Sequence, residues 1–169
     1  MARNIEIKAR LTNPKDFRHR VQALSDTAAE LLHQEDTFFN IAQGRLKLRL
    51  LSPEYGQLIY YLRPDTVGPK QSEYYISETS DPASLKNVLT KSLGVRGVIR
   101  KQRWLFLVGD TRIHLDRVEG LGDFIELEVI LQPDQTPDEG QTIARRLLTQ
   151  LNIPSQDLVE GAYIDLLEG

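Results

Sequence analysis

An alternation of polar and apolar residues recurs along this 169-residue chain, and it limits the possible folds more than any other feature. Within residues 4–11, Ile5, Ile7 and Ala9 alternate with polar side chains. Because side chains of a strand point alternately to opposite faces, this segment is predicted to be a strand with one apolar and one charged face. Residues 44–50 repeat the pattern with three cations on one face, and residues 123–129 repeat it with two carboxylates.

Eight segments are predicted to be strands, and turn residues or helices separate them. The predicted strands cover roughly residues 3–11, 34–41, 44–52, 57–63, 72–79, 96–109, 111–118 and 123–132. The two strands before the last form a long hairpin that turns at Gly109-Asp110.

Three helices are predicted between or after the strands, each with a proline at its first helical position. They begin behind Asn13, Asp81 and Thr136. In the first of them, apolar residues at helical spacing continue as far as Leu31, with an interruption at residues 25–26. A further short helix is expected at about residues 162–167.

These elements predict one domain, residues 1–169, with an α+β fold that is mainly antiparallel β. Strands joined largely by hairpins favour a closed or nearly closed eight-stranded barrel with helices packed outside, because closure removes exposed strand edges. In such a barrel the polar strand faces turn inward, whereas in an open sheet they would contact water. Burying many charges is costly unless they pair or bind ions, so a polar lumen is a candidate binding site.

The polar strand faces carry both cations and carboxylates. The cations are Lys8, Arg45, Lys47, Arg49, Arg63, Lys101 and Arg103, and the carboxylates are Glu6, Asp116, Glu126 and Glu128. Arginine binds phosphate oxygens in bidentate fashion, and carboxylate oxygens suit Mg²⁺ or Mn²⁺. Each residue alone is typical of a solvated strand face, but together they predict a site for a polyanion bridged by metal ions.

Composition limits the other possibilities. The net charge of −3 gives no field that would attract nucleic acid or an anionic membrane, and the absence of cysteine excludes disulfides and thiolate metal sites. Without an apolar leader or a long apolar run, a cytoplasmic protein is expected. His114 on a strand is more often structural than a proton shuttle, and the strand tyrosines are more often packing residues than platforms for a base.

The order of the charged motifs resembles one known family. Asn4-x-Glu6-x-Lys8 resembles the Glu-x-Glu-x-Lys signature of the CYTH superfamily, the triphosphate tunnel metalloenzymes, and the later segments 45–49, 101–103 and 114–128 match in order. Segments 101–103 and 114–128 look most like the class IV adenylate cyclase branch. Asn4 departs from the signature, because an amide stands where the first glutamate is expected and brings no negative charge.

The resemblance implies an eight-stranded tunnel that binds a triphosphate together with Mg²⁺ or Mn²⁺, and a homodimer as in related cyclases. It implies metal ligation by Glu6, Glu126 and Glu128, catalytic roles for Lys8, Glu126 and Asp116, and triphosphate binding by the seven cations named above. The implied reaction converts ATP to cyclic AMP and pyrophosphate. The alternatives are hydrolysis of tripolyphosphate, thiamine triphosphate or a nucleoside triphosphate, and a non-catalytic polyphosphate or nucleotide sensor.

Overall fold

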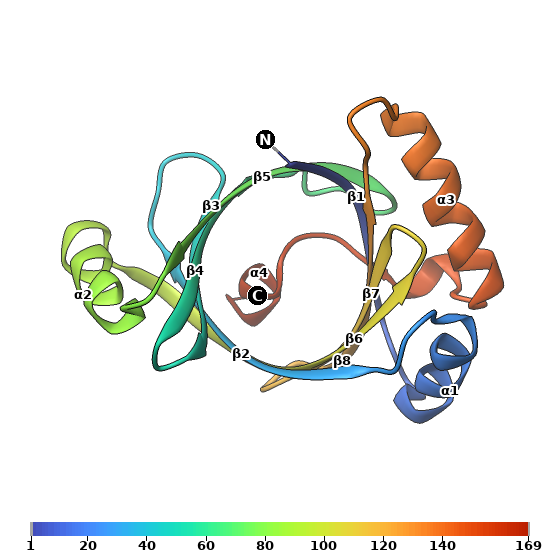
Figure 1. Ribbon diagram of the computed structural model, residues 1–169, viewed down its shortest axis with the longest axis horizontal. Coiled ribbons are helices and arrows are strands. Elements are labelled where there is room, and N and C mark those ends of the chain that lie inside the picture. The colour runs from blue at the N-terminus through green and yellow to red at the C-terminus, as the bar shows by residue number, and fades with distance from the viewer. Residues whose placement is uncertain (1, 169) are drawn as a thin grey trace.

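Eight antiparallel strands close into a barrel in the computed structural model, which describes residues 2–168 (Figure 1). The barrel strands are β1 (Ala2–Arg10), β2 (Glu30–Phe39), β3 (Arg45–Ser52), β4 (Tyr55–Leu62), β5 (Lys70–Thr79), β6 (Val95–Val108), β7 (Thr111–Val118) and β8 (Gly122–Ile130). A two-residue strand, β9 (Leu158–Val159), adds to the end of β1. The predicted barrel is therefore confirmed.

The first strand closes the barrel, because it pairs on one side with β8 and on the other with β5. Glu6 consequently lies opposite Glu128 in one neighbour and opposite Lys70 in the other. The remaining strands follow the order β5-β4-β3-β2-β6-β7-β8-β1. Since every pairing is antiparallel, the inward-facing positions of neighbouring strands lie in register around the tunnel.

The helices are α1 (Pro14–Leu24), α2 (Pro82–Leu93), α3 (Pro137–Gln150) and α4 (Tyr163–Glu168), with a 3₁₀ turn η1 (Ser155–Asp157). Thr136 and Glu139 form the reciprocal hydrogen bonds of a capping box at the start of α3. The first helix is shorter than predicted: it ends at Leu24, where Ser25 turns to an extended conformation, and Leu31 belongs to β2. Within residues 2–168 no helix is long and apolar enough to cross a bilayer.

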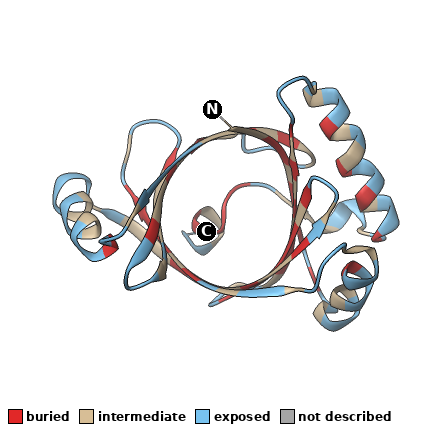
Figure 2. Ribbon diagram, in the orientation of Figure 1, coloured by how far each residue is buried: buried red, intermediate tan, exposed pale blue. Residues whose placement is uncertain are grey.

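Apolar side chains form one core outside the barrel and another inside it. Outside, α1 and α3 cover the apolar faces of β1, β6, β7 and β8, including the buried residues Ile7, Ile125 and Leu127. Inside, Phe38 of β2, Ile99 of β6 and other apolar side chains pack against α4. Buried residues accordingly follow the barrel wall and recur along α3 (Figure 2). The two cores leave the middle of the tunnel to polar side chains.

The short C-terminal helix α4 lies within the outline of the barrel rather than outside it (Figure 1). Asp165, in its first turn, accepts hydrogen bonds of 2.6 Å from both Arg45 and Arg96. Tyr163 of the same helix is buried and donates a hydrogen bond to Asp116 of β7. The helix therefore occupies one end of the tunnel, a placement that the sequence pattern did not predict.

Candidate active site

Side chains from all eight barrel strands and from α4 line a cavity of about 690 Å³ inside the barrel. The predicted site residues on its wall are Glu6, Lys8, Lys47, Arg49, Arg63, Lys101, Arg103, Glu126 and Glu128. They meet because the polar faces of neighbouring strands are in register: Lys8 lies opposite Glu126, and Glu6 lies opposite Glu128. Two predicted residues, Arg45 and Asp116, are buried but do not line the cavity.

Positive charge predominates on the cavity wall. Among the residues that the structure describes, seven lysines and arginines line the cavity, compared with five aspartates and glutamates. The wall thus carries an excess of cations although the whole chain has a net charge of −3. Such a local excess in a partly enclosed space favours a multiply charged anion.

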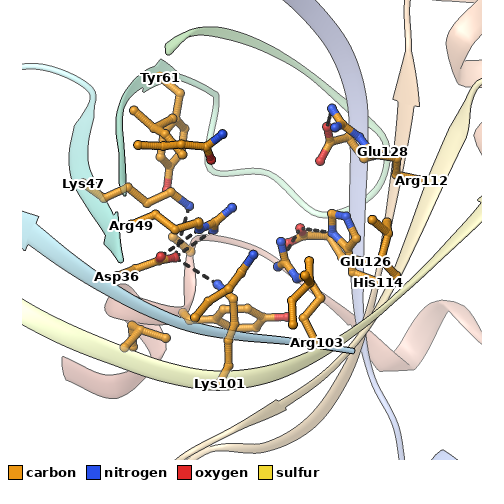
Figure 3. A pocket seen from close by; sticks show the side chains of 18 of the residues that line it. Asp36, Lys47, Arg49, Tyr61, Lys101, Arg103, Arg112, His114, Glu126 and Glu128 are labelled. Carbon is orange, nitrogen blue, oxygen red and sulfur yellow. Dashed lines mark hydrogen bonds and ion pairs between the residues drawn. The ribbon is translucent and has the colours of Figure 1, made fainter. Parts of the chain in front are cut away.

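Three cations converge on Asp36 of β2, which is 1% exposed (Figure 3). Arg49 donates two hydrogen bonds of 2.8 Å to its carboxylate, Lys101 donates one of 3.0 Å, and the Lys47 ammonium lies 3.5 Å away. Burial by itself would raise the pKa of Asp36, but these cations hold it well below its usual range. Asp36 therefore keeps the cations of β3 and β6 together on one side of the tunnel.

The opposite side of the tunnel carries the glutamates (Figure 3). Glu126 lies 3.7 Å from Lys8, 3.6 Å from Arg103 and 3.3 Å from the Nδ1 atom of His114. Burial alone would raise its pKa, but His114 and the two cations lower it well below the usual value. Glu126 is consequently an anion in the described structure, and it is available to a divalent cation.

The other two glutamates are each paired with an arginine. Arg63 donates a hydrogen bond of 2.6 Å to Glu6, and Arg112 donates one of 2.7 Å to Glu128. Burial, together with the neighbouring glutamate charges, raises the pKa of Glu6 despite the opposing effect of Arg63. A metal ion at these carboxylates would relieve the repulsion between them.

Possible ligand atoms are close together on this side. His114, Glu126 and Glu128 each offer one ligand atom, and these atoms all lie within 4.8 Å of one another. Carboxylate oxygens fit Mg²⁺ or Mn²⁺, and a phosphate would supply further oxygens. Glu6 is not part of this group, but it lies opposite Glu128 on the neighbouring strand β1.

Three lysines at the charged middle of the tunnel have depressed pKa values. Burial lowers the pKa of Lys47 well below its usual range. Burial, with Arg63 and Lys101 nearby, lowers the pKa of Lys8 to about 8 although Glu126 opposes the shift. Burial, with Arg103 and neighbouring cations, lowers the pKa of Lys101 to about 8 as well. The amines of Lys8 and Lys101 are therefore mostly cationic at neutral pH and close to losing a proton.

Asp116 supports the site from behind the cavity wall. Its carboxylate accepts hydrogen bonds of 2.7 and 2.8 Å from Arg103 and one of 2.7 Å from the Tyr163 hydroxyl. Because both oxygens are occupied and buried, Asp116 orients Arg103 toward the tunnel. Arg45 is similarly occupied, by Asp65 at 2.7 Å and Asp165 at 2.6 Å, and it holds α4 against β3.

Several inward-facing positions beyond the charged ones, on the side away from α4, are apolar, although Glu30, opposite Leu105, also lines this end of the cavity. Leu51 lies two residues beyond Arg49, and Leu105 lies two residues beyond Arg103; both line the cavity. Leu32 and Ile76 line it from the corresponding ends of β2 and β5, and Ile76 is 49% exposed. The tunnel therefore combines a charged middle with a partly apolar and partly exposed end.

Two contributors to the site escaped the sequence analysis. Asp36 occupies an inward-facing position of a strand that was predicted, so parity along that strand could have identified it. Tyr163 could not be identified in this way, because it reaches Asp116 only through the return of the C-terminal segment into the barrel. No periodic pattern in the sequence encodes that return.

A closed antiparallel barrel with cations and carboxylates facing its lumen defines a tunnel protein with a charged lumen. The CYTH domain family matches residues 2–163, and the chain belongs to this family. The adenylate cyclase CyaB of Aeromonas hydrophila is 28% identical over 175 residues, which covers 97% of this chain and 88% of that protein.

Solved structures agree with the fold. The PH1012 protein of Pyrococcus horikoshii is similar with a TM-score of 0.82 and 26% identity, over 97% of this chain and 99% of that one. A Hippeastrum protein, HpAC1, whose structure was described as revealing a dominant triphosphatase activity, is similar with a TM-score of 0.64. At 20% identity, over 98% of this chain and 95% of that one, the latter likeness concerns the fold alone.

Proposed function

We propose that this protein is a metal-dependent adenylate cyclase that binds the triphosphate of ATP inside the barrel. In this reaction the ribose 3′-oxygen loses its proton and attacks the α-phosphorus, the cyclic phosphodiester closes, and pyrophosphate leaves. The observation that carries the proposal is the set of seven cationic side chains around one cavity of about 690 Å³. Such a set matches a triphosphate of about four negative charges.

The cations bind and position the triphosphate. Arg49 and Lys101 meet at Asp36, and Arg103 projects from the adjacent position of β6, so one phosphate chain can contact all three (Figure 3). Positioning and electrostatic stabilisation are the main sources of catalysis in phosphoryl transfer. The cations stabilise the negative charge that the phosphate oxygens carry in the transition state. Lys47, Arg63 and the other tunnel cations complete this environment.

The carboxylates suit a divalent cation. Glu126 and Glu128 would hold Mg²⁺ or Mn²⁺, with Glu6 on the adjacent wall, and their donor atoms fit an ion that prefers oxygen. When bound, the ion supplies Lewis-acid polarisation of phosphorus and neutralises charge on the departing pyrophosphate. Each of these glutamates is paired with a lysine or arginine in the free protein. When the ion binds the glutamates, those lysine and arginine side chains become available to bind phosphate.

Lys8 is the candidate for direct participation. Its amine lies 3.7 Å from Glu126 and has a pKa of about 8, so it can bind phosphate as a cation or accept the hydroxyl proton when neutral. For Asp116 we propose a positioning role, through its two hydrogen bonds to Arg103. Arg45 was predicted to bind the triphosphate. We propose that it contributes indirectly, by binding Asp165 and so holding α4 in the tunnel.

The apolar side chains at one end of the tunnel support a nucleotide over inorganic tripolyphosphate. Leu32, Leu51, Ile76 and Leu105 offer no hydrogen bonds to a phosphate, but they suit the flat surface of a base. The adenylate cyclase relative in Aeromonas is consistent with this choice. The second candidate is a triphosphatase, in which water attacks a terminal phosphorus, since the charged middle of the tunnel serves either reaction equally.

Product analysis distinguishes these functions. Purified protein is incubated with Mg²⁺ or Mn²⁺ and, separately, with ATP and tripolyphosphate, and the products are identified by ³¹P NMR and chromatography. Cyclic AMP with pyrophosphate supports the cyclase, whereas orthophosphate without cyclic AMP overturns it in favour of a triphosphatase. Tight ATP binding without turnover identifies a sensor. The Glu126→Gln variant controls for contaminating enzymes, because it should abolish turnover and leave the fold intact.

A further inference from the structure

The imidazole of His114 lies within the group of glutamates on the tunnel wall. In the register of β7 and β8, His114 is directly opposite Glu126, and Arg112 is directly opposite Glu128. His114 is 5% exposed and lines the cavity. Its Nδ1 atom lies 3.3 Å from Glu126 Oε1, which is long for a hydrogen bond between nitrogen and oxygen. The ring therefore faces the carboxylates without a short hydrogen bond to either.

The spacing of the three side chains suits a single ion. Metal–ligand bonds of about 2.1 Å place adjacent ligands of an octahedron about 3 Å apart and opposite ligands about 4.2 Å apart. The ligand atoms of His114, Glu126 and Glu128 lie within 4.8 Å of one another, so small side-chain rotations bring them to these distances. No other hydrogen bond of the His114 ring is found among residues 2–168, so such a rotation would break no other hydrogen bond of the ring.

A second observation points to a ligand in the same cavity. Asn4 of β1 is 1% exposed and lines the cavity, yet its side-chain oxygen has no hydrogen-bond partner among the described residues. The amide contributes an oxygen but no charge, and Glu6, the next inward-facing residue of β1, is held by Arg63. Strand β1 thus contributes an uncharged amide oxygen and a carboxylate that is already paired, while His114 offers a nitrogen ligand beside Glu126 and Glu128.

We infer that His114 is a ligand of the metal ion, together with Glu126 and Glu128, and that this site prefers Mn²⁺ to Mg²⁺. Imidazole nitrogen binds first-row transition ions well, whereas Mg²⁺ prefers an all-oxygen environment. The inference rests on the metal dependence proposed above and adds the identity of a ligand and of the favoured ion. Catalytic rates with the two ions need not follow the affinities, so the test measures binding.

Pulsed EPR of Mn²⁺ tests the inference without any turnover. The probe is the complex of full-length protein, Mn²⁺ and the bis-methylene analogue of tripolyphosphate, which is inert to hydrolysis and contains no nitrogen. We expect ³¹P couplings from the phosphate and a ¹⁴N coupling from one histidine. Protein labelled with ¹⁵N only in histidine should replace the ¹⁴N signal by a ¹⁵N signal, and this experiment requires no substitution.

Variants identify the histidine. His114→Gln should keep the ³¹P couplings, lose the nitrogen coupling and reduce the ratio of Mn²⁺ to Mg²⁺ affinity about tenfold or more. The matched control is His19→Gln on the exposed surface of α1, which should leave both signals unchanged.

The two signals separate the possible failures. Phosphorus couplings without histidine nitrogen coupling in the unsubstituted protein would overturn the role of His114 and leave the metal-dependent function intact. Absence of both couplings would overturn the metal–triphosphate site itself, and the present inference with it.

Discussion

Replacement of Asp36 by asparagine tests whether the cations of the tunnel are held by this one carboxylate. Asp36 is 1% exposed and contacts Arg49, Lys101 and Lys47 within 3.5 Å. Asparagine keeps the shape but removes the charge, so three cations lose their common buried counter-ion. Removing one partner of a buried ion pair costs about 3 kcal/mol or more. For a chain of this length that loss corresponds to a decrease in Tm of about 6 to 12 °C.

The same substitution should strengthen binding of a triphosphate. In the unsubstituted protein an incoming phosphate competes with Asp36 for the cations, whereas in Asp36→Asn it meets them unpaired. We expect tripolyphosphate to bind about tenfold more tightly, equivalent to about 1.4 kcal/mol, and to raise the Tm of the variant more than that of the unsubstituted protein.

Urea denaturation and isothermal titration calorimetry measure the two effects. Glu35→Gln is the matched control, because Glu35 immediately precedes Asp36 in β2, points outward and, among residues 2–168, pairs with the exposed Lys86 and Arg100. Its free energy of unfolding should change by less than about 0.5 kcal/mol. An Asp36→Asn variant with unchanged stability and unchanged tripolyphosphate affinity would refute the shared-carboxylate arrangement.

Three further predictions concern pH, α4 and packing. Lys8 and Lys101 have pKa values of about 8 in the free protein, so the affinity for tripolyphosphate should fall as the pH rises from 7 to 9. Binding near pH 8 should take up protons, because the bound anion favours the cationic amines. Calorimetry in buffers of different ionisation enthalpy measures this uptake, and its absence would contradict the prediction. Asp165→Asn removes an anion that binds two arginines and should cost about 1 kcal/mol of unfolding free energy in urea, whereas unchanged stability would mean that α4 is held by its apolar contacts. In Gly140→Ala a Cβ would lie 2.6 Å from Leu131, so overpacking should outweigh the gain of about 1 kcal/mol in helix propensity; a more stable variant would contradict the close approach of α3.

The barrel and most of its lining could be predicted because both depend on local patterns. Alternation with a period of two identifies the inward face of each strand, and antiparallel pairing brings those faces together wherever the barrel closes. Lys8 and Glu126 illustrate this: each was predicted from its own strand, and the register places them opposite one another. Their roles in binding and catalysis remain predictions.

Other features depend on the three-dimensional course of the chain and could not be predicted locally. Arg45 has the same parity as Lys47, but its position at the start of β3 places it beside α4, where Asp165 binds it. Asp116 has the parity of His114, yet Tyr163 and Arg103 occupy its carboxylate. In both cases the C-terminal helix decides which inward-facing side chains remain open to the cavity.

A crystal structure with an inert ATP analogue tests the central claim most directly. The protein is crystallised with α,β-methylene ATP and Mn²⁺, since the methylene group blocks departure of pyrophosphate. We predict that the phosphates lie inside the barrel within hydrogen-bond distance of Arg49, Lys101 and Arg103, that the ion lies at Glu126 and Glu128, and that the base contacts Leu105. Phosphates bound outside the barrel, or a tunnel that stays empty while the analogue binds elsewhere, would contradict the account.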